Sequence, residues 1–159
     1  MLAKSVLDVL NEQLTIERHN EAVYKCASAA LKNIAWDGFA AFCDKQASGE
    51  AKHAAMIQNY LVDRGHAPVY AALDAIPTTT VSLRDGFRQL YDLELATTSH
   101  LKECYFVSET ADDPQTCIFL QPLLTEQVEE EKTLSDLVAQ LWRATDNASL
   151  LVLDGRYGG

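Results

Sequence analysis

Four long segments of the chain repeat apolar residues every three or four positions, which is the spacing of amphipathic helices. They cover about residues 6–34, 39–62, 83–110 and 114–144. Asp113 followed by Pro114 is a typical helix start, with a capping side chain and then proline at the first helical position. Valine and threonine are sparse in these segments, and no strand-like alternation stands out. The sequence therefore predicts an all-α fold.

Loop lengths indicate how these helices are arranged. A few residues join the first helix to the second and the third to the fourth, so each pair should be an antiparallel hairpin. Residues 65–81 join the two pairs and, at ~3.3 Å per residue, can span ~55 Å. A helix of roughly 28 residues is only ~42 Å long. One long crossover therefore makes the second and third helices parallel. We expect a four-helix bundle over residues 1–145 and a short C-terminal helix or tail over 146–159.

Composition restricts the partners. The net charge is −10, and without a basic stripe this argues against nucleic acid, whereas it suits a protein that attracts cations. No segment approaches the roughly 20 apolar residues of a membrane span, and the acidic residues near the N-terminus do not fit a secretory signal. The four cysteines form no C-x-x-C pair and are expected to be reduced thiols. A cytoplasmic location is the expectation.

Carboxylates interrupt the apolar stripe of every predicted helix. One interruption could be the partly exposed edge of a stripe, but four facing carboxylates without an inward Lys or Arg need another source of positive charge. Two divalent cations would balance them. The residues are Glu17, Glu50, Glu94 and Glu130, with His53 one turn after Glu50.

The chemistry of these ligands indicates which metal is bound. Carboxylate oxygens with one imidazole suit iron or manganese better than copper(I) or a structural zinc. A shared carboxylate can bridge two ions ~3.5–4 Å apart. Glu50, on the same helix turn as His53, is the candidate for the bridge. A Glu-x-x-H pair alone would be weak evidence, because such pairs also occur on exposed helix faces.

Four stretches together resemble the bacterial non-haem ferritins, without large gaps to about residue 145. They are NEQLTIER around Glu17, GEAKHAAMIQNYL around Glu50, the isolated Glu94, and FLQPLLTEQVEEEK around Glu130. The resemblance implies the ferritin-like four-helix bundle and an iron-storage role with ferroxidase activity.

The resemblance also implies a role for individual residues at a di-iron ferroxidase centre with two irons per subunit. The first iron would be held by Glu17, Glu50 and His53, and the second by Glu50, Glu94 and Glu130. Gln127 and Tyr24 would lie beside this centre, although Tyr24 could equally be a core-packing residue. Glu126 and Glu129 would form an accessory iron site or a solvated acidic face.

The resemblance further implies that Fe(II) is oxidised by O2, or by hydrogen peroxide, and stored as Fe(III) mineral in a hollow shell of 24 subunits. No haem is expected, because Ala51 stands where haem-binding relatives have methionine. Three alternatives are a mainly detoxifying oxidase, a bundle that binds metal only for structure, and a di-iron oxygenase. The oxygenases fit poorly, because they usually carry two E-x-x-H motifs.

Three features depart from the family pattern. Gly49 stands where some bacterial ferritins have a glutamate that contributes to a third iron site. Pro122 lies inside the fourth helix, where it is expected to produce a kink. The tail has room for only a short fifth helix. The remaining histidines are assigned to the surface or to packing: His19, His66 and His100.

Overall fold

The computed structural model describes residues 1–76 and 82–158. It contains five helices in the order α1 (Lys4–Asn33), α2 (Asp37–Asp63), α3 (Leu83–Thr110), α4 (Pro114–Arg143) and α5 (Asn147–Tyr157). The described part of the chain has no β-strand. The all-α prediction is therefore confirmed, and each long helix begins and ends within a few residues of the sequence estimate.

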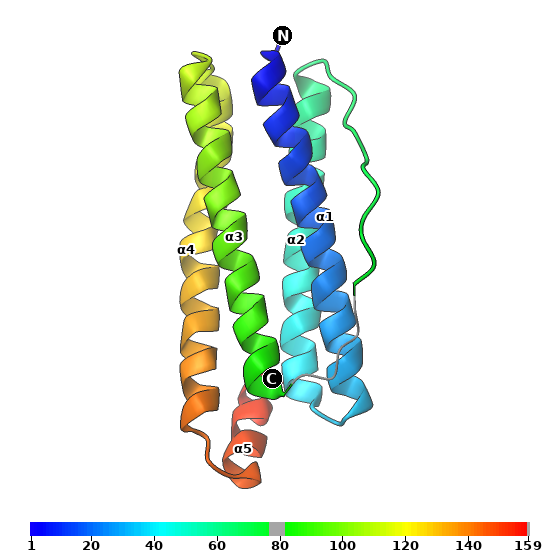
Figure 1. Ribbon diagram of the computed structural model, residues 1–159, viewed down its shortest axis with the longest axis vertical. Helices are drawn as coiled ribbons and strands as arrows, with labels where there is room; N and C mark the ends of the chain where they lie inside the picture. The colour runs from blue at the N-terminus through cyan, green and yellow to red at the C-terminus, as the bar shows by residue number, and fades with distance from the viewer. Residues whose placement is uncertain (77–81, 159) are drawn as a thin grey trace.

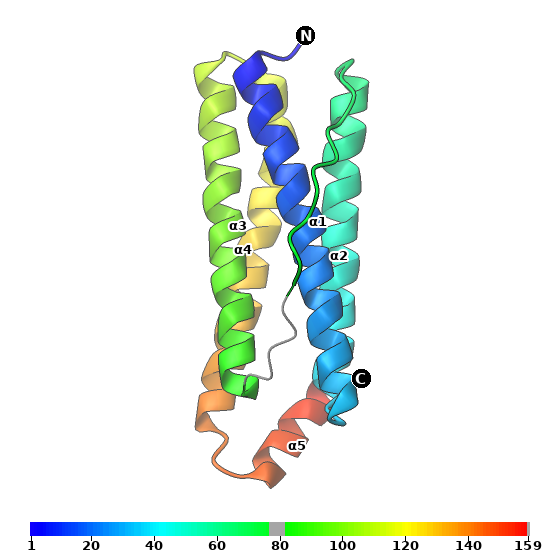
Figure 2. The same cartoon turned by 45° about the vertical axis from the view of Figure 1, so that its right-hand side comes forward.

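The first four helices form the bundle with one crossover (Figures 1 and 2). α1 and α2 are an antiparallel hairpin, as are α3 and α4, and α2 runs parallel to α3 as expected. The crossover begins after Asp63 and its described part descends beside α1 (Figure 2). Residues 77–81 of the expected linker lie outside the described residues. Asn11 Oδ1 accepts the Val69 N–H at 2.7 Å, and Arg18 donates to the Ala71 carbonyl at 3.1 Å, so α1 holds the crossover in place.

Local sequence signals set the helix ends. The Asp113 carboxylate accepts the backbone N–H of Thr116 at 3.2 Å, with Pro114 as the first helical residue of α4. Ser82 caps α3 in the same way, at 3.2 Å from the Asp85 N–H. Helix α4 continues through Pro122. The missing N–H leaves the Ile118 carbonyl without its helical donor, but both side chains are exposed on that side of the helix, where water can replace the bond.

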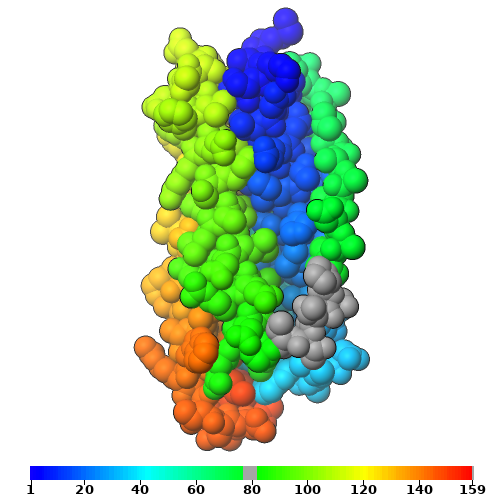
Figure 3. Space-filling model, in the orientation of Figure 1, coloured from blue at the N-terminus to red at the C-terminus, as the bar shows by residue number. Residues whose placement is uncertain are grey.

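A polar layer divides the core into two apolar clusters. The one nearer the α1–α2 turn contains Tyr24, Phe39 and Leu137, and the other contains Leu10, Ile57 and Leu101. The polar layer lies between them. Along α1, Leu14 belongs to the second cluster and Tyr24 to the first, and the buried Glu17 lies between these two residues. On the face shown in Figure 3, α1 and α3 pack directly against each other.

The fifth helix closes the lower end of the bundle by packing on the start of α2 (Figure 1). The Asp154 carboxylate accepts the Phe39 N–H at 2.8 Å, so a side chain of α5 satisfies one of the free donors at the α2 N-terminus. Tyr157 packs edge-on against Phe42, with ring centroids 5.5 Å apart. None of the described helices is long and apolar enough to cross a membrane.

Candidate metal centre

The polar layer consists of one carboxylate from each long helix. Glu17 of α1, Glu50 of α2 and Glu94 of α3 are at most 2% exposed. Glu130 of α4 is half-buried. The 3.6-residue helical period explains this arrangement, because these positions continue the apolar stripes that face the bundle interior. The four carboxylates, predicted to face one another from their stripes, do meet in the folded chain.

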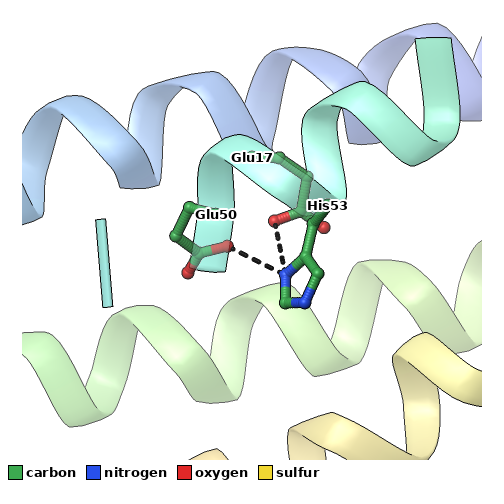
Figure 4. Close-up of side chains that lie close together, drawn as sticks. All are labelled: Glu17, Glu50 and His53. Carbon is green, nitrogen blue, oxygen red and sulfur yellow. Dashed lines mark hydrogen bonds and ion pairs between the residues drawn. The ribbon is translucent and has the colours of Figure 1, made fainter. Parts of the chain in front are cut away.

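Their oxygens form two overlapping groups. In one, Glu17, Glu50 and His53 each offer a ligand atom, and these atoms lie within 4.8 Å of one another (Figure 4). In the other, Glu50, Glu94 and Glu130 do the same. Glu50 belongs to both groups, which is the position that a bridging carboxylate occupies between two ions.

The donor set suits cations. Among the described residues, no Lys or Arg forms an ion pair with any of the four carboxylates, and His53 is the one basic side chain that pairs with them. Three buried oxygens also have no hydrogen-bond donor: Glu17 Oε2, Glu50 Oε1 and Glu130 Oε2. Buried acceptors are rarely left without a partner, and each of these oxygens is free to bind a metal ion.

Burial makes these carboxyl groups hard to ionise without a cation. Loss of water raises the pKa of Glu50 to about 8, and repulsion from Glu94 and Glu130 adds to the effect. Burial, with repulsion from Glu94, raises the pKa of Glu130 to about 7. Burial likewise raises the pKa of Glu94, and that of Glu17 well above its usual range. Without metal, the centre therefore retains protons near neutral pH.

Two side chains hold the carboxylate of Glu94. The Tyr24 hydroxyl donates to Glu94 Oε1 at 2.5 Å, and the Gln127 amide donates to Oε2 at 3.2 Å. Tyr24 is fully buried, and burial beside Glu94 raises its pKa, so it remains a donor. Tyr24 therefore contacts the centre directly as well as packing in the core.

His53 connects the buried centre to an exposed carboxylate. Its Nδ1 lies 3.3 Å from Glu50 Oε2 and 3.9 Å from Glu17 Oε2. Its Nε2 lies 2.7 Å from Glu126 Oε2. An ionised carboxylate only accepts, so Nε2 carries the hydrogen and Nδ1 presents its lone pair to the centre. This role for Glu126 was not foreseen from the sequence, which assigned Glu126 to an accessory site or a solvated face.

The acidic residues of the proposed accessory site lie on the solvent-exposed side of the centre. Glu126 and Glu129 are exposed and border a hollow of about 360 Å³ that Glu130 also lines. Lys45 and Gln46 of α2 line its other side. Glu130 thus stands between the buried centre and the hollow. Gly49 is helical, and a Cβ added there would meet no atom within 4 Å.

Two residues beside the centre were missed from the sequence. The Gln13 amide donates to Glu17 Oε1 at 2.7 Å, and His100 Nδ1 lies 2.6 Å from Gln13 Oε1. Gln13 could have been found, because it lies one turn before Glu17 on the same stripe. His100 gave no signal, since its contact with Gln13 spans 87 residues of sequence.

Over most of its length the chain is similar to known proteins. The family model described as "Ferritin-like domain" matches residues 7–144. A bacterial non-heme ferritin of Staphylococcus haemolyticus is 30% identical over 153 residues, covering 96% of this chain and 92% of the relative. One of Escherichia coli O6:H1 is 30% identical over 141 residues, covering 89% and 86%. A structure of an open-pore ferritin from the archaeon Archaeoglobus fulgidus superposes with a TM-score of 0.96 at 26% identity, covering 99% of this chain and 98% of the other.

Proposed function

The chain belongs to the ferritin family, and from this premise we propose that it is an iron-storage ferroxidase with a di-iron centre inside each bundle. Glu17, Glu50 and His53 hold the first Fe(II). Glu50, Glu94 and Glu130 hold the second, with Glu50 as the bridge. Gln127 and Tyr24 orient the ligands of the second iron.

The observation that carries this proposal is the overlap of the two ligand groups at Glu50. Four carboxylates in a buried layer without a basic partner require about two divalent charges for neutrality. Oxygen ligands with a single imidazole favour iron over the thiolate-seeking metals. A bundle that binds metal only for structure would need neither the shared carboxylate nor the open hollow beside Glu130.

The protein's part in oxidation is to bind, orient and exchange protons. Binding of Fe(II) requires the carboxyl groups to ionise, so the protons held near neutral pH by Glu50 and Glu130 are released. Tyr24 and Gln127 then hold both oxygens of Glu94, and Glu126 keeps the lone pair of His53 Nδ1 toward the first iron. Two Fe(II) ions give up one electron each. With two protons, these electrons reduce O2 to hydrogen peroxide, which is itself an alternative oxidant.

The Fe(III) product leaves through the hollow beside Glu130. Glu126 and Glu129 line this hollow and act as accessory iron ligands on the way to a mineral store. We propose that 24 subunits enclose that store, as a homo-oligomer in the cytoplasm. We assign the iron-binding bundle to residues 1–145 and a short C-terminal helix or tail to residues 146–159. The similarity to other ferritins supports an assembled shell.

The test is aerobic addition of Fe(II) to the metal-free protein, followed by O2 consumption and by particle size before and after loading. We expect oxidation much faster than in buffer, loss of this activity in Glu50→Ala, and an iron-filled particle. Glu103→Ala is the matched control, because Glu103 is an exposed carboxylate on α3. A monomer that oxidises iron no faster than buffer would contradict the proposal. Oxidation without mineral retention would favour a detoxifying oxidase.

A further inference from the structure

His100 lies outside the carboxylate layer, yet two hydrogen bonds join it to Glu17. His100 Nδ1 on α3 is 2.6 Å from Gln13 Oε1 on α1. Gln13 Nε2 donates to Glu17 Oε1 at 2.7 Å. Gln13 is fully buried, and the His100 side chain is only 11% exposed. Such bonds are strong in a buried setting, because water does not compete for the same donors and acceptors.

The direction of both bonds follows from the donor inventory. In the structure Gln13 turns its NH2 group toward Glu17 and its carbonyl toward His100. Iron binding keeps this arrangement, because a Glu17 carboxylate that binds a cation is ionised and only accepts. Because the Gln13 carbonyl also only accepts, His100 Nδ1 must carry a hydrogen. Cys104 Sγ lies 3.5 Å from the same nitrogen, but its own S–H donates to the Val9 carbonyl, also at 3.5 Å.

We propose that His100 is a positioning residue for the first iron, acting on Glu17 through the Gln13 amide. Without the Nδ1–H donor, the Gln13 carbonyl has lost its partner, so the amide is less restrained and its NH2 group no longer holds Glu17 in one position. With the donor, Glu17 Oε1 is fixed by Gln13. Oε2 then faces His53 Nδ1 at 3.9 Å without a hydrogen-bond partner of its own, and this is the oxygen that binds the iron.

This role rests on the proposed function, because it depends on Glu17 being a ligand of the first iron. It predicts a selective effect, since the hydrogen bonds of Gln13 lead to Glu17 and His100, and neither residue forms a hydrogen bond or ion pair with Glu94 or Glu130. Loss of the donor should weaken one of the two iron positions and leave the other unchanged. A general loosening of the bundle would weaken both.

The test is an anaerobic calorimetric titration of the assembled, metal-free protein with Fe(II). We expect His100→Leu to weaken one of the two irons by about tenfold, within the range for residues behind metal ligands. His100→Asn should retain wild-type affinity, because the Asn Nδ2 amide takes the place of Nδ1–H. His100→Gln should not, because its amide lies one carbon further out, and this variant serves if His100→Leu does not fold.

Gln13→Leu removes the link between His100 and Glu17 and should produce the same selective loss. The double variant His100→Leu/Gln13→Leu should be no weaker than Gln13→Leu alone, because both changes break one pathway. His19→Leu is the control, since His19 lies beside the crossover. It should leave both affinities unchanged.

The outcomes separate this role from the proposed function. If the wild-type protein binds two Fe(II) per subunit and His100→Leu binds both as tightly, the role of His100 is overturned alone. Equal weakening of both irons, additive losses in the double variant, or no rescue by His100→Asn would also overturn it. If the wild-type protein binds fewer than two Fe(II), the proposed function fails and the role of His100 fails with it.

Discussion

Tyr24 donates a hydrogen bond of 2.5 Å to Glu94 Oε1 across 70 residues of sequence, and so ties α1 to α3 inside the candidate metal centre. Both side chains are fully buried. The bond favours the ionised form of Glu94, because it lowers the pKa of a carboxyl group that burial raises. A carboxylate that ionises more easily binds a cation more readily.

Replacing Tyr24 by Phe should therefore weaken the second iron position and slow Fe(II) oxidation by about tenfold. It also leaves Glu94 Oε1 without its donor, which costs about 1–3 kcal/mol of stability in the metal-free protein. Stopped-flow oxidation and denaturant unfolding measure the two effects. Tyr60→Phe is the control, because the Tyr60 hydroxyl bonds Thr116 away from the centre. If Tyr24→Phe oxidises Fe(II) at the wild-type rate, the role of Tyr24 is limited to packing in the core.

The metal-free protein should lose stability as the pH rises from about 5 to 8. The pKa of Glu50 is raised from 4.5 to about 8 and that of Glu130 to about 7, both mainly by burial. The folded state therefore holds protons that the unfolded state has lost, so stability is fully present below pH 4.5 and falls as the pH passes 7 and 8. Denaturant midpoints measured across this range test the trend.

Two comparisons isolate the cause of this pH dependence. Glu50→Gln should flatten the slope, because an amide cannot ionise. Loading with Fe(II) should also flatten it, because the bound metal replaces the protons, and the released protons can be measured in weak buffer. Carboxyl groups with lowered pKa values change the stability only below this pH range, so they do not affect the trend. They are Asp44, Asp113 and Asp146. A midpoint that rises from pH 5 to 8 would contradict the prediction.

Gly49→Glu should increase the number of tightly bound irons per subunit. Position 49 lies one turn after Lys45 and Gln46, so its side chain would enter the hollow lined by Glu126 and Glu129. Nothing lies within 4 Å of the added Cβ, so the substitution causes no clash where the new side chain leaves the helix. Anaerobic Fe(II) titration measures the stoichiometry, and Gly49→Gln is the uncharged control. The same stoichiometry in both variants would count against an accessory site.

Gly38→Ala should detach α5 from the bundle. An added Cβ would lie 1.8 Å from the Asp154 carbonyl oxygen. Because this oxygen belongs to the backbone of α5, the clash can be relieved only if α5 moves away from α2. Its displacement would also break the bond from Phe39 N–H to Asp154. We expect a loss of about 2 kcal/mol or more, together with rapid proteolysis of the C-terminal segment.

Gly49→Ala is the matched control for Gly38→Ala, because it changes another α2 glycine with open space around it. It should stabilise the protein by about 0.5–1 kcal/mol, since alanine is the better helix former. Thermal unfolding compares the two variants. Equal stability in both would mean that the close approach of α5 to Gly38 is not maintained in solution.

Much of the fold follows from patterns within single segments. Apolar spacing predicted the helix from about residue 6 to 34, and α1 spans Lys4–Asn33. The Asp113–Pro114 pair marked the start of α4. The hydrogen bond between Asp154 and Phe39 could not be predicted in this way. It joins residues 115 positions apart, and it depends on the direction that the chain takes after α4.

The sequence by itself determined that Glu17, Glu50, Glu94 and Glu130 face the interior, because helical periodicity fixes the direction in which each side chain leaves its helix. It also identified Glu50 as the candidate for the shared position. Only the tertiary structure decided which atoms meet, including His53 with Glu126 and His100 with Gln13. A hydrogen bond depends on distances of a few tenths of an ångström, and those are set by the rotation and spacing of packed helices, which no single segment encodes.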